Sequence, residues 1–327
     1  AGTMLTVLIM IYAERRVSAF IQGRLGPNRV GPQGIFQPLA DGIKFLMKED
    51  IIPAGVDKPI FILAPAILLI PALMTFAVIP FGSDITLFGR QIPLQVADVD
   101  VGILYILALT SIGVYGIVLA GWSSNSKYSL LGGLRSSAQL ISYELAMGLA
   151  VVSIILLSGS LKLNDIVGDQ QGSLFSWNVF KQPLAFIIFL VAVYAETNRL
   201  PFDLSEAEQE LVGGYHTEYS SMKFAMFFMA EYANMITAAA LTVTLFFGGW
   251  DVPFVNETSL GLWGAMLSVG SFILKMGFFL FLFIWVRWTF PRFRYDQLMR
   301  LGWKVMLPMA LFNIFVTAGY LTLKAVI

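Results

Sequence analysis

The chain has 327 residues, of which 57% are hydrophobic and 13% are charged, and its formal net charge is zero. An average soluble domain carries about 25% charged residues, so the composition excludes a soluble globular protein and indicates one that crosses a membrane several times. Zero net charge gives no bulk attraction for nucleic acid. With no cysteine, and with His216 as the one histidine, the chain excludes cysteine-ligated iron–sulfur clusters, bis-histidine haem and disulfides. We also expect no other haem or iron–sulfur cluster, no metal site and no flavin within it.

Apolar runs close to the roughly 20 residues of a transmembrane helix recur along the chain. Seven are clear: 59–80, 102–121, 136–158, 182–198, 224–250, 262–286 and 304–323. Residues 1–13 are also apolar, but as a helix they would reach only about 20 Å. Because the chain begins at Ala1 without a methionine, we expect a piece of an eighth helix to be missing; a signal peptide fits poorly, since no basic region precedes the run. The expected fold class is all-α, a single polytopic bundle over residues 1–327 with about eight transmembrane helices.

The basic residues lie mainly in alternate loops. The loops 14–58, 122–135, 199–223 and 287–304 hold 16 of the 21 Lys and Arg residues. Basic loops remain on the cytoplasmic side of a membrane, or on the matrix side in mitochondria. We therefore expect these four loops on that face and both termini on the other.

The first of these loops contains two features. Residues 33–48 alternate apolar and charged positions with helical spacing, which predicts an amphipathic helix along the membrane surface. Residues 23–32 are rich in Gly and Pro, which forbid a continuous helix and favour sharp turns. Such a turn can hold arginines against a ligand, and a solvated connector is the alternative reading.

Four charged residues lie inside the apolar runs: Glu144, Glu196, Glu231 and Lys275. A charge in the bilayer core costs several kcal/mol unless it is paired or solvated. The pattern is typical of proteins that move or couple charge within a membrane. The alternative is that these groups pair only to hold helices together.

Two loops of opposite charge complete the pattern. The loop 201–211 is acidic and contains Asp203, Glu206, Glu208 and Glu210. Like charges one helical turn apart repel by a few tenths of a kcal/mol, so this loop requires basic neighbours or partial protonation. The last loop offers such neighbours, because aromatic residues alternate there with Arg287, Arg292 and Arg294. An interfacial anchor is the alternative reading of that loop.

Several longer motifs add a resemblance to this reading. They are ERR at 14–16, GPNRVGP at 26–32, GWSSNSKY at 121–128, SYE at 142–144, AETNRLPFD at 195–203 and PRFRYD at 291–296. In this order, over nearly the whole chain, they resemble the signature stretches of the H subunit of NADH:quinone oxidoreductase, respiratory complex I.

The resemblance implies eight transmembrane helices and a position where the membrane arm joins the hydrophilic arm. It implies that the chain forms the membrane-side part of the quinone tunnel and begins the polar path along which reduction of quinone by NADH drives proton pumping. The implied substrate is ubiquinone or menaquinone. The implied partners are the quinone-site subunits of the hydrophilic arm on the cytoplasmic or matrix face, small membrane subunits and antiporter-like subunits. The implied location is the bacterial cytoplasmic membrane or the mitochondrial inner membrane.

Carried over by residue, the resemblance divides the charged positions into three groups. The quinone cavity is expected to contain Glu14, Arg15, Arg24, Asp41, Lys44, Arg199 and Asp203. Proton coupling is expected at Glu144, Glu196, Glu206, Glu208, Glu210 and Glu231, and Lys275 joins this group because it lies within a span. The charges that balance the acidic loop are expected to be Arg287, Arg292 and Arg294.

Two alternatives remain open from the sequence. The chain would also suit a homologous membrane subunit of an energy-converting hydrogenase or a related oxidoreductase, since the electron input lies in other subunits. A stand-alone secondary ion or proton transporter is the third reading. The absence of an inverted repeat and the charged loops on one face argue against it.

Overall fold

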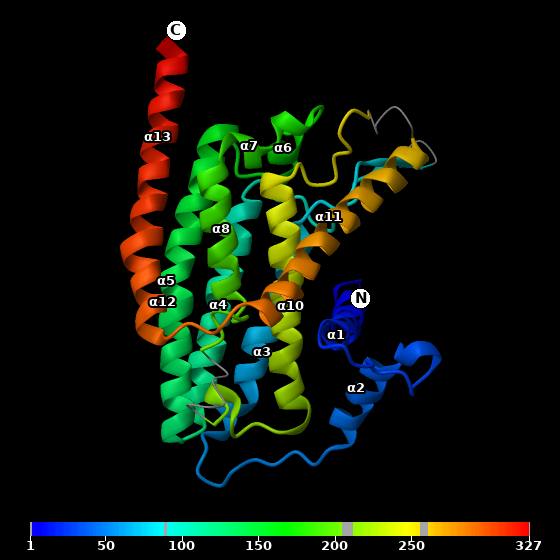
Figure 1. The fold of residues 1–327 in the computed structure, drawn as a ribbon, viewed down its shortest axis with the longest axis vertical. Coiled ribbons are helices and arrows are strands. Elements are labelled where there is room, and N and C mark those ends of the chain that lie inside the picture. The colour runs from blue at the N-terminus through cyan, green and yellow to red at the C-terminus, as the bar shows by residue number, and fades with distance from the viewer. Residues whose placement is uncertain (1, 88–89, 205–211, 256–260, 327) are drawn as a thin grey trace.

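The computed structural model describes residues 2–87, 90–204, 212–255 and 261–326, and these are largely helical (Figure 1). The long helices are α1 (Gly2–Ile21), α3 (Lys58–Met74), α4 (Gly102–Ser123), α5 (Lys127–Ser158), α8 (Pro183–Glu196), α10 (Ser221–Phe246), α11 (Leu262–Thr289) and α13 (Leu307–Val326). The short helices are α2 (Gln37–Met47), α6 (Leu163–Gly168), α7 (Asn178–Lys181) and α12 (Tyr295–Leu301), with 3-10 turns at Pro32–Gly34, Thr75–Val78, Leu174–Ser176 and Gly214–His216. One antiparallel hairpin, β1 (Ile85–Leu87) and β2 (Arg90–Ile92), pairs Ile85 with Ile92.

The expected fold class is confirmed, because the described residues form a bundle of helices suited to a membrane. Six helical segments are long and apolar enough to span one: Lys58–Val78, Gly102–Ser123, Lys127–Ser158, Ser221–Phe246, Leu262–Thr289 and Tyr295–Val326. The fourth expected span corresponds to α8, a shorter apolar helix of 14 residues. The apolar run 1–13, expected to belong to an eighth helix, corresponds to α1. For α1 and α8 a membrane crossing stays a prediction.

Helix α1 is longer than the apolar run that predicted it. It continues past residue 13 to Ile21, and its 20 residues correspond to about 30 Å of helix. The charged residues after position 13 do not end the helix because they find partners: Glu14 is buried, and Arg15 pairs with Asp41 of α2. Tertiary contacts therefore override the local sequence signal.

Two other helices begin earlier than expected. Helix α5 starts at Lys127, nine residues before the predicted span, and α12 runs into α13 through a π turn at Gly302–Met306 without a break. The early turns of α5 carry small residues that let other backbones approach, since a Cβ on Gly132 would lie 2.7 Å from the Gly214 Cα. These turns form because they pack, not because they are apolar.

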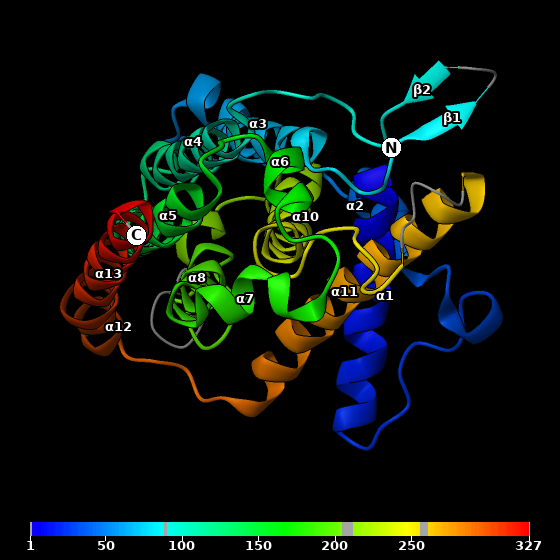
Figure 2. The ribbon, with the colours of Figure 1, turned by 90° about the horizontal axis from the view of Figure 1, so that it is seen from above.

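Helices α3, α4, α5, α8 and α10 supply most of the buried core, and the view along the bundle shows α10 near its middle (Figure 2). Glycines bring three of them into close contact. A Cβ on Gly116 of α4 would lie 3.0 Å from the backbone nitrogen of Leu68 in α3, and one on Gly121 of α4 would lie 2.6 Å from the carbonyl oxygen of Ser129 in α5. Helices in lipid associate through such close packing.

The remaining long helices lie on two sides of this core. Figure 2 shows α1, α2 and α11 on one side and α12 with α13 on the other. The helix predicted at 33–48 is present over a shorter range as α2, after the turn Pro32–Gly34, with Pro38 buried and Leu39, Ile43 and Leu46 exposed. Its position along the membrane surface stays a prediction. We call the end of the bundle at which α3, α5 and α10 begin the inner end, and the opposite end the outer end.

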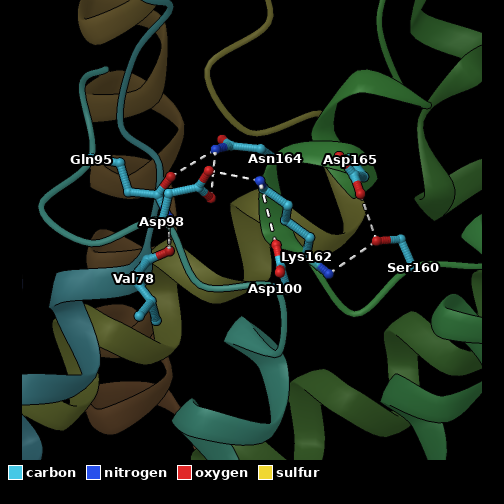
Figure 3. Close-up of polar contacts among 8 residues, drawn as sticks. All are labelled: Val78, Gln95, Asp98, Asp100, Ser160, Lys162, Asn164 and Asp165. Atoms are coloured by element: carbon cyan, nitrogen blue, oxygen red, sulfur yellow. Dashed lines mark hydrogen bonds and ion pairs between the residues drawn. The ribbon is translucent and has the colours of Figure 1, made fainter. Parts of the chain in front are cut away.

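A polar network fastens the loops at the outer end (Figure 3). The Lys162 Nζ lies 2.7 Å from an Asp98 carboxylate oxygen and 3.7 Å from one of Asp100, and the Asn164 amide donates to the Gln95 side chain at 2.7 Å. Hydrogen bonding to Asp98 raises the pKa of Lys162 above its ordinary value. The network joins the segment after β2 to the start of α6, and its exposed ion pairs contribute little to stability.

Candidate functional site

Glu14 of α1 is the centre of a buried polar cluster near the inner end of the bundle. Its Oε1 accepts a hydrogen bond from Arg199 Nη1 at 3.0 Å and another from Arg287 Nη1, and its Oε2 accepts one from the Tyr232 hydroxyl at 2.7 Å. These donors come from the segment after α8, from α10 and from α11. One carboxylate therefore joins four parts of the chain.

Arg199 remains charged although it is only 6% exposed. Burial alone would lower the pKa of its guanidinium, but the carboxylate of Glu14 raises that pKa above its ordinary value. The guanidinium also lies 4.6 Å from the centre of the Tyr232 ring, a cation–π distance. Arg199 and Glu14 thus form a compensated ion pair that is largely excluded from solvent.

A polar cavity of about 480 Å³ opens beside this cluster. Glu14, Arg15, Arg24 and Arg287 all line it. The structure therefore brings together the expected quinone-site residues Glu14, Arg15 and Arg24, with Arg199 bonded to Glu14 behind them. Arg24 Nε also donates to the Gln22 side chain at 2.6 Å.

An apolar cavity of about 460 Å³ adjoins the polar one between α1, α2 and α10. Its apolar walls include Leu8, Phe45 and Phe228, and its rim carries Arg15 and Asp41, which form an ion pair. Arg15 and Tyr232 line both cavities. The two cavities together offer an apolar channel that meets a charged end.

Three of the intramembrane carboxylates share a smaller cavity inside the bundle. Glu144 of α5, Glu196 of α8 and Glu231 of α10 line about 30 Å³ of water-accessible space, together with polar residues such as Asn198 and Asn234. A neighbouring space of about 20 Å³ also touches Glu196 and Asn234. Each space can hold at least one water molecule, which needs roughly 10–15 Å³.

Hydroxyl groups of α4 support two of these carboxylates. The Ser111 hydroxyl donates to Glu144 Oε1, and Thr110 hydrogen-bonds to Glu196. A serine and a threonine at consecutive positions of one helix therefore serve two acids from two different helices. Glu144 and Glu196 thus have hydrogen-bond partners and lie beside a cavity that can hold water, an arrangement that suits proton exchange.

The charged cavity and the carboxylate cavity are joined by consecutive residues in two places. Asn198 lines the carboxylate cavity, and the next residue, Arg199, bonds to Glu14. Glu231 lines the carboxylate cavity, and the next residue, Tyr232, bonds to Glu14 and lines the other two cavities. A displacement of Glu14 would therefore act on both cavities.

Lys275 lies away from the three carboxylates. Its Nζ donates to the carbonyl oxygens of Phe247 at 2.9 Å, Gly249 at 3.1 Å and Asp251 at 2.7 Å, and it lies 4.6 Å from the centre of the Trp177 ring. These carbonyls belong to the turn that follows α10 at the outer end. An ammonium group has three N–H donors, and here they bond the three carbonyl oxygens that follow α10. Lys275 therefore caps the C-terminal end of this helix.

The other expected residues are distributed around the inner end. Asp203 is buried and accepts a hydrogen bond from Arg292 Nη2 at 3.0 Å, so one pair between the acidic and the basic loop exists. Lys44 and Arg294 are exposed. Glu206, Glu208 and Glu210 lie outside the described residues.

Sequence reasoning missed several residues of these cavities. Thr110 and Ser111 lie in an apolar run without charges, and Asn234 lies in the run that contains Glu231. Tyr232 was not recognised as a site residue because aromatic residues are common in membrane helices. The available signal was its position directly after Glu231, since neighbours on a helix turn about 100° apart and can face two adjacent cavities.

The fold and these cavities define a polytopic integral membrane protein with ionisable side chains inside its helix bundle. Within the described ranges, no group of three or more His, Cys, Asp and Glu residues is arranged to hold a metal ion.

Known proteins match the chain over nearly its whole length. Residues 1–318 match the family model of NADH dehydrogenase. An H subunit of NADH-quinone oxidoreductase from Geobacter sulfurreducens is 57% identical over 98% of this chain and 92% of its own length. The H subunit of Leptospira biflexa is 57% identical over 94% of this chain and 88% of its own, and subunit 8 of the Rhodothermus marinus enzyme is 57% identical over 96% and 92%.

The chain belongs to the H-subunit family of NADH-quinone oxidoreductase, respiratory complex I. It is a multi-pass membrane subunit whose partners are other subunits of that enzyme. The family membership favours the first of the three readings of the sequence over a hydrogenase subunit or a stand-alone transporter.

Proposed function

We propose that the chain forms the membrane-side part of the quinone tunnel and transmits quinone chemistry to proton-carrying carboxylates. The observation that carries this proposal is the junction of the apolar and polar cavities at Arg15 and Tyr232. A quinone has an isoprenoid tail and a polar head. The apolar cavity suits the tail, and the charged cavity suits a head that gains negative charge on reduction.

The tail path can be tested by adding volume to its wall. Gly42 of α2 lines the apolar cavity, and a Cβ built on it meets nothing within 4 Å. Gly42→Leu should therefore fold and narrow the path, lowering kcat/KM for a long-tailed quinone roughly tenfold, about 1.4 kcal/mol, while a tail-less quinone is little affected. Gly270→Leu in α11, where a Cβ also has open space, is the control. Equal loss with both quinones would remove the apolar cavity from the path.

The head site can be tested at Arg24, which lines the charged cavity. Arg24→Ala should impair quinone reduction by the assembled complex but leave electron transfer from NADH to a soluble artificial acceptor intact. Arg29→Ala removes an exposed arginine of the same Gly/Pro-rich turn and should have little effect. Unchanged quinone kinetics in Arg24→Ala would exclude it from the site.

For coupling, we propose that Glu144, Glu196 and Glu231 pass protons through their shared cavity. The residue pairs Asn198–Arg199 and Glu231–Tyr232 support this, because they join that cavity to Glu14 beside the quinone site. A change of charge at the quinone would shift the Glu14 cluster and with it the surroundings of the carboxylates. The contacts of Lys275 suit a helix-closing role better than a place in this relay.

The relay can be tested by removing titration while keeping size. Glu144→Gln and Glu231→Gln should lower quinone turnover and proton uptake together, and Glu144→Asp should lower them less. Both are measured per assembled complex in proteoliposomes. If these acids only hold helices together, the Gln variants keep full activity and show lower assembled yield, and the relay is then excluded.

We propose that the loops at the inner end of the bundle bind the hydrophilic arm. The exposed charges of the inner loops, including Lys44 and Arg294, support a contact with a soluble partner. The small membrane subunits and antiporter-like subunits would contact the apolar outer sides of the bundle.

A further inference from the structure

A separate cleft opens at the outer end of the bundle, far from the cavities near Glu14. It has a volume of about 770 Å³ and lies between α13, the end of α5 and the start of α8. In Figure 1 the last turns of α13 rise beyond the ends of these two helices. A cleft of this size is within the range of small-molecule sites.

The cleft carries an excess of positive charge. Lys181 of α7 and Lys324 of α13 both line it, and Asp169 is the acidic residue of its lining. Burial lowers the pKa of Lys181, Asp169 partly offsets that effect, and the nearby Lys324 lowers the pKa further. Two cations thus share the cleft with one carboxylate, which leaves one positive charge to be neutralised.

A helix terminus adds to this positive potential. Helix α8 begins at Pro183, which lines the cleft beside Leu184. Pro183 has no N–H, so the first backbone donors of α8 belong to Leu184 and the residues after it, and the positive end of the helix dipole favours an anion here. The two lysines and the N-terminal end of α8 therefore both contribute positive potential to the cleft.

The floor of the cleft is fixed by hydrogen bonds between α8 and α13. The Gln182 amide donates to the Thr317 hydroxyl at 2.8 Å, and the Asn313 amide donates to Gln182 Oε1 at 3.0 Å. All three side chains are buried. The two helices are therefore joined at the base of the cleft and separate only above it.

The flanks of the cleft are apolar. Leu157 and Leu184 line one side, and Val316 and Leu321 line the other, while the exposed Tyr320 lies near Lys324 on α13. Polar groups at the end of a membrane helix with apolar residues below them match a lipid, which has a charged head above apolar chains. A free phosphate would leave the apolar flanks unused.

We propose that this cleft binds an anionic phospholipid with one net negative charge. Its phosphate lies between Lys181 and Lys324 at the start of α8, and an acyl chain lies along the apolar residues of α13. Basic pockets between transmembrane helices on the cytoplasmic or matrix face recognise lipid head groups, and the same pairing of lysine with phosphate is available at this outer cleft. This lipid would also fill the space between α13 and the rest of the bundle. The proposal does not depend on the quinone site.

The assembled complex, reconstituted in phosphatidylcholine vesicles, provides the test. A trace of photoactivatable phosphatidylglycerol should label residues 307–326 about tenfold more than photoactivatable phosphatidylcholine, because only the former carries net charge. The double variant Lys181→Gln/Lys324→Gln should abolish this preference. Lys162→Gln, which removes another lysine of the outer end, should preserve it, and Lys181→Arg/Lys324→Arg should restore it.

Several results would overturn the proposal. Equal labelling by both lipids, or an unchanged preference in the double Gln variant, would show that the lysines do not select the head group. Absence of labelling would show that another subunit covers the cleft. Displacement of the lipid by inorganic phosphate would show that the cleft recognises phosphate without its lipid. Labelling is scored per assembled complex, so a variant that assembles poorly is not mistaken for one that has lost the site.

Discussion

Among single residues, Glu14 has the most consequential surroundings. A buried carboxylate is tolerated only where donors replace its water shell, and Arg199, Tyr232 and Arg287 supply those donors. The arrangement is reciprocal, because Arg199 is equally buried and has Glu14 as its main counter-charge, with Glu231 contributing less. Removing one member of a buried pair costs about 3–5 kcal/mol, since the other charge is left uncompensated.

This reciprocity predicts unequal effects of two conservative changes. Glu14→Gln should destabilise the region around the inner ends of α1 and α8 by about 3 kcal/mol, and Tyr232→Phe, which removes a hydrogen bond to a charged group, should do so by about 1.5 kcal/mol. Hydrogen exchange of residues 12–20 and 197–204 in the assembled complex measures both. If these segments exchange hydrogen no faster in Glu14→Gln than in Tyr232→Phe, Glu14 is not the main counter-charge of Arg199.

His216 predicts a pH dependence. It is buried beside Tyr215 and Phe224, and burial lowers its pKa to about 4. In the unfolded chain the pKa is about 6.5, so the folded state binds the proton less readily. His216 therefore does not reduce the free energy of unfolding above pH 6.5, where it is neutral in both states. As the pH falls from 6.5 toward 4 the free energy of unfolding decreases, by about 2 kcal/mol at pH 5.

The measurement is hydrogen exchange of residues 212–228 at pH 7.5 and pH 5, corrected for the intrinsic rate. The wild-type segment should lose protection at pH 5. His216→Gln, which cannot titrate, should lose much less. Identical losses in both proteins would assign the pH dependence to other groups.

Which charged residues lie inside the bundle could be read from the sequence, whereas which of them meet could not. An ionisable group in an apolar run is conspicuous, so Glu144, Glu196 and Glu231 were identified directly. The partners of Glu14 lie 185, 218 and 273 residues away along the chain, and no local pattern encodes such contacts. Lys275 was conspicuous for the same reason as the acids, yet it contacts backbone carbonyls instead.

Among elements, the start of α5 shows how packing extends a helix beyond its apolar run. Hydropathy predicted a start at 136, but the helix begins at Lys127, and the additional turns bury Ser129, Gly132 and Gly133. Hydropathy measures the preference for lipid, whereas these turns are stabilised by contact with other backbones. The bounds of α4 and α11 agree with their apolar runs to within a few residues.

Two glycines of α5 provide a matched test of this explanation. Gly132→Ala would place a Cβ 2.7 Å from the Gly214 Cα, and the resulting displacement should cost about 1–3 kcal/mol. Gly148→Ala has open space around its Cβ and should be neutral or gain up to about 1 kcal/mol of helix stability. The amount of assembled complex in membranes, measured over a range of growth temperatures, should fall for the first variant alone. Equal yields would show that α5 tolerates separation from residues 214–216.

Across the whole molecule, orientation is the property that the sequence predicts and the fold makes testable. The basic loops lie where α3, α5 and α10 begin, so the inner end should face the cytoplasm or matrix. The native chain has no cysteine, which makes single cysteines specific labels. Lys127→Cys at the inner end and Gln171→Cys at the outer end are both exposed positions.

A membrane-impermeant thiol reagent should label Lys127→Cys from the inner side and Gln171→Cys from the outer side. The experiment uses sealed vesicles of both orientations after peripheral subunits have been removed. Labelling of Lys127→Cys from outside would invert the topology. It would also contradict the proposed docking of the hydrophilic arm at the inner end.

The long separations within the Glu14 cluster also have a consequence for biosynthesis. The helix carrying Glu14 leaves the ribosome long before its partners, because Arg199 follows 185 residues later and Arg287 follows 273 residues later. At roughly 5–20 residues per second, the carboxylate waits about 10–40 s for the first arginine and about 15–55 s for the second. During that interval an unpaired charge in the bilayer costs several kcal/mol. We therefore expect α1 to rest at the lipid surface while α3 to α10 insert, and to enter the membrane only as α11 closes over it.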